Sequence, residues 1–274
     1  MLAEVSEDKA TGDIAVIFAE VRDLWGVPYV SAIQRHLATR PGFLEWAWEA
    51  VGPAFRSGAA QQAGERAATG AVLAPLAPMS REVLAVWGVD DVGLATIRST
   101  AEGFVRVAPI NMMFAGLVKA LLAGATPGGA TSGASPIWSK PRPLPAPPAM
   151  VSPDKVDAAT RGALMHLATP SDGKPFVPGL YRMLAHWPGY LAHLATVLPP
   201  RLSEPATIAV FDQIRARIDA VVPEVLATLP TRHAARPMPV QSEREHFLTI
   251  GGTYRKTSPE LIVLGRLISD ALPR

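Results

Sequence analysis

The sequence contains no cysteine among its 274 residues. Disulfide bonds, thiol nucleophiles and thiolate metal sites are therefore excluded. The six histidines show neither the HExxH pattern nor any other spacing typical of metal ligands. The glycine motifs of nucleotide-binding loops and the GxSxG motif of serine hydrolases are also missing. We therefore expect neither a metal ion nor a cofactor.

Charge is scarce and evenly balanced. Only 18% of the residues are charged, the formal net charge is +2, and no block of five or six like charges occurs. Such a surface does not favour nucleic acid binding. No run of 18 uncharged apolar residues predicts a membrane span, and the polar, acidic start at residues 1–9 is unlike a signal peptide. We expect a cytoplasmic protein that binds neither nucleic acid nor membranes.

Apolar residues make up 49% of the chain, and most of them recur with helical spacing. In residues 13–24, with Asp13 as the expected N-cap, the apolar face is formed by Ile14, Ile17, Phe18 and Val21. Further helices are expected at 29–38, 43–51, 57–73, 80–86, 90–100, 105–122, 158–167, 180–186, 204–221, 243–248 and 259–272. Strand-like alternation is nearly absent. The sequence predicts an all-α fold.

The chain is rich in proline, with 27 residues, and part of this proline marks a boundary. Residues 126–153 change abruptly to a Gly/Ser/Pro-rich and then Pro-rich composition, which is typical of a linker that becomes extended. A Pro-rich run of this kind can also bind an SH3-type domain, but spacers are the commoner use. We expect a first helical repeat at 1–125, a linker at 126–156 and a second helical repeat at 157–274.

The two halves of the sequence resemble each other. Pro41-Gly42 and its surroundings recur at Pro188-Gly189, an offset of 188 − 41 = 147 residues. Towards the end of each half the offset is 149, because Gly103 corresponds to Gly252 (252 − 103 = 149). A held offset indicates an internal repeat. Two copies of one unit in one chain should form a pseudo-dimer, and ligand sites favour interfaces between units.

A second stretch rich in proline and glycine, residues 168–178, carries Asp172. Its composition predicts a tight, rigid loop between apolar helices, in which Asp172 either makes a local turn or presents a carboxylate for chemistry. Asn111 begins an apolar stretch, where it either caps a helix or, if buried, requires partners. The second repeat has Glu260 at the position of Asn111. An acid from one repeat facing an amide from the other would make an asymmetric site.

Several short segments together resemble a known family. They are Val-Pro-Tyr-Val at 27–30, Arg-His-Leu-Ala-Thr-Arg-Pro-Gly-Phe-Leu-Glu-Trp-Ala-Trp at 35–48, Ile-Asn-Met-Met-Phe at 110–114, Thr-Pro-Ser-Asp-Gly at 169–173 and the second Pro-Gly-Tyr-Leu at 188–191. As a set they resemble the group I 2-haloacid dehalogenases, which act on both enantiomers of 2-haloalkanoic acids. The resemblance covers both repeats and the linker. It implies an all-α pseudo-dimer with a site between the repeats.

The resemblance also implies a mechanism and site residues. An aspartate activates a water molecule that attacks the halogen-bearing carbon directly, and no ester forms on the enzyme. By position the residues implied are Asp172 as the base, Asn111 as the amide that positions the water, Ser171 as its pocket neighbour, Phe114 and Trp25 as aromatic pocket walls, and Glu65 as a further acid. Gln61 stands where the family has a threonine, which is a departure from the pattern around Glu65.

The implied function is hydrolytic dehalogenation of D- and L-2-haloalkanoic acids to 2-hydroxy acids with inversion of configuration. The partner would be a small halogenated carboxylic acid, and a homodimer is possible. Two alternatives stay open. The chain could hydrolyse another small carboxylate, or it could be a non-catalytic helical repeat protein that binds a small carboxylate or a protein partner, because fold does not determine function.

Overall fold

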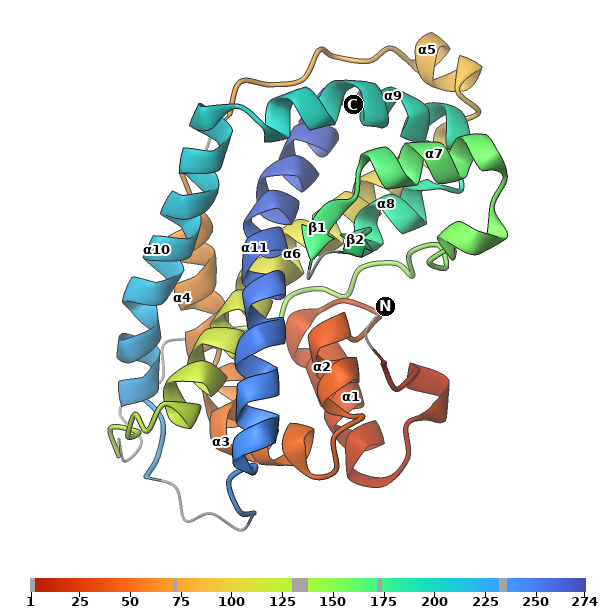
Figure 1. Cartoon of the computed structure of the whole chain (residues 1–274). Coiled ribbons are helices and arrows are strands. Elements are labelled where there is room, and N and C mark those ends of the chain that lie inside the picture. Colours follow the sequence, from red (N-terminus) through yellow and green to blue (C-terminus); the bar gives the residue numbers. More distant parts are fainter. Residues whose placement is uncertain (1–2, 71–72, 130–137, 172–173, 232–235) are drawn as a thin grey trace. The chain divides into compact units, whose positions relative to one another are not determined.

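The computed structural model describes the whole chain except residues 1–2, 71–72, 130–137, 172–173 and 232–235 (Figure 1). The described residues are helical apart from one short hairpin and the connections, which confirms the all-α class. The helices are α1 (Gly12–Trp25), α2 (Ala32–Leu37), α3 (Phe43–Arg56), α4 (Ala59–Ala68), α5 (Arg81–Val86), α6 (Asp91–Leu122), α7 (Ala158–His166), α8 (Gly179–Leu184), α9 (Pro188–Leu202), α10 (Pro205–Ala227) and α11 (Gln241–Ala271). Short 3-10 turns occur at Glu7–Lys9 and Pro153–Lys155.

Side-chain caps begin some of these helices. The Ser80 hydroxyl accepts a hydrogen bond from the Val83 amide at 3.3 Å, as its sequence context predicts for α5. Asp157 accepts from two amides of the first turn of α7, each at 3.0 Å. The expected cap Asp13 is wrong, because α1 begins one residue earlier and Thr11 occupies the N-cap position. Asp13 instead lies in the first turn, where a carboxylate favours the helix dipole.

Two long helices run through prolines that the sequence analysis treated as breaks. Residues 90–100 and 105–122 form the single helix α6 with Pro109 inside it, and 243–248 and 259–272 form the single helix α11 with Pro259 inside it (Figure 1). Proline removes one backbone hydrogen bond, and packing of the flanking turns can outweigh that loss. By length and composition α6 could cross a membrane, but 72% of its most apolar window is buried inside the protein, as in a core helix.

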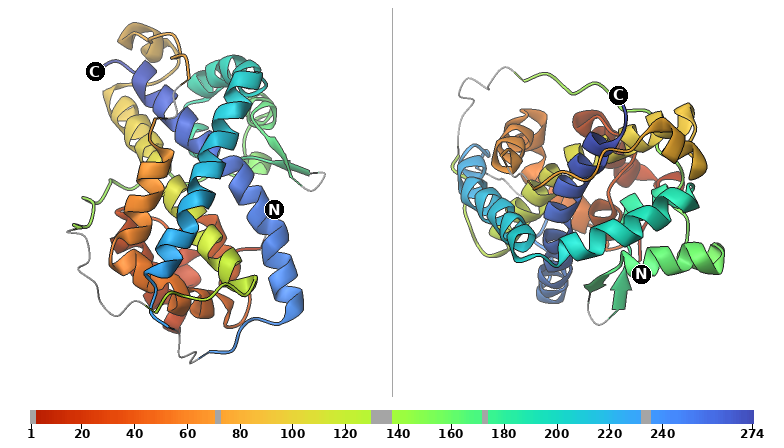
Figure 2. Two further views of the ribbon diagram at one scale, coloured as in Figure 1. Left: turned by 90° about the vertical axis from the view of Figure 1, so that its left-hand side faces the viewer. Right: turned by 90° about the horizontal axis from the view of Figure 1, so that it is seen from above.

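The predicted loop at 168–178 is a β-hairpin. Strands β1 (Thr169–Ser171) and β2 (Lys174–Phe176) pair antiparallel, with Thr169 opposite Phe176 and Pro170 opposite Pro175. Proline has no N–H, so the proline pair fits the position of the ladder that exchanges no hydrogen bonds. The hairpin projects from α7 and α8 in both views of Figure 2. The prolines that suggested a rigid loop are thus compatible with a two-stranded ribbon.

The chain divides into two compact units. The first unit comprises Met1–Thr69, Arg106–Leu144 and Ile214–Ser258, and the second comprises Gly70–Val105, Pro145–Gln213 and Pro259–Arg274. Helices α6, α10 and α11 therefore contribute residues to each unit. Each unit contains segments of both sequence halves.

The order of the elements follows the two sequence halves. Helix α2 spans Ala32–Leu37 and α8 spans Gly179–Leu184, so both ends of α8 follow those of α2 by 147 residues (179 − 32 and 184 − 37). The last residue of α11, Ala271, follows the last residue of α6, Leu122, by 149 residues (271 − 122). These are the offsets of the sequence similarity, and this agreement supports the predicted repeat.

Candidate active site

In the first unit, Arg106 fastens α6 to the segment that leads into α2. Its Nη1 donates to the carbonyl oxygens of Gly26 at 2.8 Å and Arg142 at 2.7 Å. Gly26 ends α1 with φ of 62°, in the left-handed region that favours glycine. A Cβ at this position would lie 2.7 Å from the Pro141 ring and 2.9 Å from Arg106 Nη1. Glycine is therefore required here both for its backbone angle and for the close approach of Arg106.

The chain between α1 and α2 is also fixed from the N-terminal side. The Val30 amide donates to Glu7 at 2.8 Å, and Glu7 forms an ion pair with Arg22 at 2.6 Å. Burial raises the pKa of the adjacent Tyr29, and the positive charge of Arg106 opposes this rise only in part. Tyr29 is therefore a neutral phenol at physiological pH. These contacts determine where α2 begins.

Asn111, on α6, is held by two side chains of α2 and its N-cap. Its Nδ2 donates to the Ser31 hydroxyl at 2.9 Å, and its Oδ1 accepts from Gln34 Nε2 at 3.3 Å. Gln34 is fully buried, whereas Ser31 and Asn111 are partly exposed. Asn111 lies inside α6, so the alternative that it caps a helix is wrong. The amide is oriented by both of its ends.

Phe114 and Trp25 lie in an aromatic cluster centred on Phe55. The ring of Phe55 is 6.2 Å from that of Trp25 and 6.2 Å from that of Phe114, and it stacks on Trp48 at 5.7 Å. All four rings are buried. Phe114 follows Asn111 by three residues on α6, so the cluster packs directly behind the Asn111 turn. The roles expected of Phe114 and Trp25 as pocket walls stay predictions.

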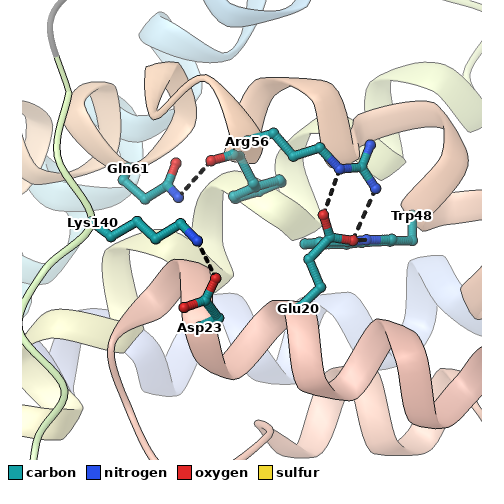
Figure 3. Close-up of polar contacts among 7 residues, drawn as sticks. Glu20, Asp23, Trp48, Arg56, Gln61 and Lys140 are labelled. Carbon is teal, nitrogen blue, oxygen red and sulfur yellow. Dashed lines mark hydrogen bonds and ion pairs between the residues drawn. The ribbon is translucent and has the colours of Figure 1, made fainter.

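An ion pair fixes the outer side of this cluster (Figure 3). Glu20 on α1 accepts two hydrogen bonds from Arg56 on α3, at 2.6 and 2.9 Å, and a third from Trp48 Nε1 at 2.7 Å. The guanidinium of Arg56, followed by Trp48, holds the pKa of Glu20 below its usual value against the effect of burial. The two-pronged contact fixes α1 against α3.

Gln61, on α4, is a buried amide with backbone partners. Its Nε2 donates to the carbonyls of Phe55 at 2.9 Å and Leu24 at 3.5 Å (Figure 3). Gln61 therefore joins α4 to α3 and α1. Glu65, one turn later, is exposed, and its carbonyl accepts from the amide and hydroxyl of Thr69. The role in the site expected of Glu65 stays a prediction.

Asp172 lies outside the described residues, and so does the side chain of Ser171, whose backbone is part of β1. Their expected roles therefore stay predictions. Two polar residues that the sequence analysis did not select, Ser31 and Gln34, contact Asn111. A signal for Gln34 was present, because it occupies the apolar face of α2 together with Val30, Ile33 and Leu37.

The second unit has a different polar pair at the corresponding positions. Tyr181 follows Gln34 by 147 residues (181 − 34) and Glu260 follows Asn111 by 149 (260 − 111). The Tyr181 hydroxyl donates to Glu260 Oε1 at 3.3 Å, and both residues are buried. Burial, followed by the negative charge of Glu260, raises the pKa of Tyr181. One pair of positions thus holds two amides in the first unit and a phenol with a carboxylate in the second.

Among the residues that the structure describes, no three histidine, aspartate or glutamate side chains gather as a metal site would require. No family profile matches the chain. An (R)-2-haloacid dehalogenase of Rhizobium sp. (strain NHG3) is 28% identical over 245 residues, which are 84% of this chain and 89% of that protein.

Solved structures of D-2-haloacid dehalogenase have the same fold. A complex of a mutant with D-2-CPA superposes with a TM-score of 0.75 and a complex with L-LA with a TM-score of 0.76. Each is 20% identical, and each comparison covers 99% of this chain and 96% of the other. The chain is therefore a sequence relative of an (R)-2-haloacid dehalogenase and has the fold of D-2-haloacid dehalogenase.

Proposed function

We propose that the protein hydrolyses 2-haloalkanoic acids to 2-hydroxy acids and halide. The observation that carries this proposal is the sequence relationship to an (R)-2-haloacid dehalogenase, which extends over 84% of the chain. The shared fold supports it, because the likeness covers 99% of the chain. Since the relatives are named for the R or D enantiomer, we propose D-2-haloalkanoic acids as substrates. Use of the L enantiomer as well, which the sequence resemblance implies, is part of the same test.

In the proposed reaction, water attacks C2 of the substrate from the side opposite the halogen. The new C–O bond forms as the C–halogen bond breaks, and the halide leaves with the bonding electron pair. Asp172 accepts the proton that the water loses, because water alone is a poor nucleophile. The configuration at C2 is inverted. No group other than water and the carboxylate is needed to balance the reaction.

Asn111 has the properties required to orient that water. An amide both donates and accepts hydrogen bonds, and the contacts with Ser31 and Gln34 fix which end does which. Each contact uses only part of the capacity of the amide, since Nδ2 has a second N–H and Oδ1 a second lone pair. These remaining positions are available to a water molecule.

The test is to incubate purified protein with D- and with L-2-chloropropionate and to measure chloride and lactate. We expect chloride and lactate in equal amounts from the D enantiomer, and the lactate should be the L form. Folding is checked by circular dichroism on the same sample. A folded protein that releases no chloride from either enantiomer would refute the proposal and favour the non-catalytic alternative.

A further inference from the structure

Gln34 is a glutamine in a position where the fold provides an apolar environment. It is 0% exposed and shares its face of α2 with Val30, Ile33 and Leu37, which are each at most 1% exposed. Glutamine is seldom buried completely, because its amide must then find hydrogen-bond partners. An apolar side chain at position 34 would avoid that requirement. The amide therefore calls for an explanation other than packing.

The hydrogen bonds around Gln34 run in one direction. Gln34 Nε2 donates to Asn111 Oδ1, and Asn111 Nδ2 donates to the Ser31 hydroxyl. At the start of this chain of bonds, Gln34 Oε1 is buried and has no partner in the described part of the structure. A buried carbonyl without a partner costs about 1–3 kcal/mol. Such an acceptor is normally satisfied by water or a ligand.

The corresponding pair in the second unit shows the alternative. There the Tyr181 hydroxyl donates directly to Glu260. Tyrosine brings one hydroxyl to this contact, whereas glutamine brings a donor and an acceptor at the two ends of its amide. The first unit thus keeps an acceptor that the tyrosine of the second unit does not offer. This difference places the open acceptor beside Asn111 and not at Glu260.

We infer that Gln34 Oε1 accepts a hydrogen bond from a water molecule that Asn111 also contacts. Under the proposed function, on which this step rests, that water is the one that attacks C2. It donates one hydrogen to Gln34 Oε1 and the other to Asp172, which leaves a lone pair for the carbon. Gln34 acts in two ways, since it also fixes the orientation of Asn111 through the Nε2 hydrogen bond.

Substitution by glutamate, Gln34→Glu, tests both contacts of Gln34. While the new carboxyl group is protonated it reproduces the glutamine, because its O–H donates to Asn111 and its carbonyl accepts from water. Once ionised it can only accept, so Asn111 must turn its N–H towards it and lose its orientation. We expect the ratio of the kcat of Q34E to that of wild type to be highest at acid pH. It should fall at least about tenfold with rising pH, which is about 1.4 kcal/mol of barrier.

Substitution by methionine removes both ends of the amide at similar length. We expect Gln34→Met to lower kcat at least about tenfold and to change KM less than about threefold, because the water and not the substrate loses its contact. The matched control is Gln61→Met, which removes another buried amide whose Oε1 has no partner in the described structure and whose Nε2 bonds to backbone carbonyls. The control should lower the melting temperature and leave kcat within about twofold.

A Gln34→Met variant that keeps its kcat within about twofold while folded would overturn the inference, and so would a pH-independent activity ratio for Q34E. A crystal structure of the wild-type protein that resolves waters tests the binding part without any assay. We expect a water within hydrogen-bond distance of both Gln34 Oε1 and Asn111. A bound halide at the Gln34 amide, or a dry Oε1, would refute this part. If the wild type releases no chloride, the proposed function fails, and the crystal structure still decides whether Gln34 binds water.

Discussion

The Nε2 atoms of His36 and His246 lie 2.8 Å apart in the first unit. Arg40 approaches the same His246 nitrogen to 3.2 Å, and the other ring nitrogen of His36 lies 2.7 Å from the Ala3 carbonyl. Two imidazole nitrogens at this distance share a single proton, because two N–H groups would face each other. The pair joins α2, α11 and the N-terminal segment, so its protonation state affects the stability of the first unit.

The first prediction concerns acid sensitivity. Burial, then the charges of Arg40 and His36, lower the pKa of His246, and Glu243 opposes them. The folded protein therefore binds protons at this site less readily than the unfolded chain, whose histidine pKa is about 6.5. The contribution of His246 to stability is present above about pH 6.5 and is lost as the pH falls through the lower folded pKa.

We expect urea denaturation to show a smaller loss of stability between about pH 7.5 and 5.5 in His246→Gln than in wild type. Measurements should stay above about pH 5, because Glu20, whose pKa Arg56 lowers, begins to lose its own contribution below that range. His193, stacked on Trp87, also has a pKa lowered by burial, so the single variant removes only part of the slope. Equal slopes in the two proteins would contradict the role of His246.

The second prediction compares two buried tyrosines of the second unit. The Tyr181 hydroxyl donates to Glu260, whereas the Tyr190 hydroxyl is buried without a partner in the described structure. Tyr181→Phe should destabilise the protein by about 1.5–3 kcal/mol, because a hydrogen bond to a charged group is lost. Tyr190→Phe should be neutral or slightly stabilising, since it removes a hydroxyl that has only a desolvation cost. Chemical denaturation of both variants measures the difference, and equal effects would speak against the pairing of Tyr181.

The third prediction concerns Asp172→Asn. The amide cannot take a proton from water as a carboxylate does, so turnover of D-2-chloropropionate should be abolished. The melting temperature should stay close to that of wild type, because only one side chain of the chain between β1 and β2 is altered. Residual turnover within about tenfold of wild type, or about 1.4 kcal/mol of barrier, would rule out Asp172 as the base.

The fourth prediction distinguishes a general base from a nucleophile. If Asp172 deprotonates water, the solvent oxygen enters the 2-hydroxy acid directly. If Asp172 attacked C2 itself, hydrolysis of the resulting ester would leave solvent oxygen in its carboxylate. A single turnover with enzyme in excess, in ¹⁸O-labelled water, should therefore label the product and leave the Asp172 peptide unlabelled in mass spectrometry. Label in that peptide would indicate a covalent ester.

Local signals in the sequence predicted much of the fold. Helical spacing of apolar residues identified the class, and serine or aspartate before a helical run marked the starts of α5 and α7 correctly. Proline was misleading in both directions. Pro109 and Pro259 suggested helix ends, but tertiary packing keeps α6 and α11 continuous. The prolines of 168–178 suggested a loop, although proline is compatible with the unbonded positions of a hairpin.

The candidate site was predictable only in part. Asn111 could be selected because an amide in an apolar stretch requires partners, but the identity of those partners depends on which turn of α2 reaches α6. That contact is set by Gly26 and Arg106, and neither residue reveals it through local spacing. Gln34 was overlooked because one polar residue in a short helix is usually exposed. Its burial is visible only when the opposite helix is in place.

The discontinuous composition of the two units has a consequence for synthesis on the ribosome. The first unit needs residues 214–258, and the second needs residues 259–274. Neither unit is complete until nearly the whole chain has been translated, although the first 69 residues belong to the first unit. Contacts between residues so distant in sequence also slow folding, because long loops must close before the contacts form. The nascent chain therefore exposes the apolar faces of α1, α3 and α4 for most of its synthesis, which makes it a substrate for chaperones that bind such faces.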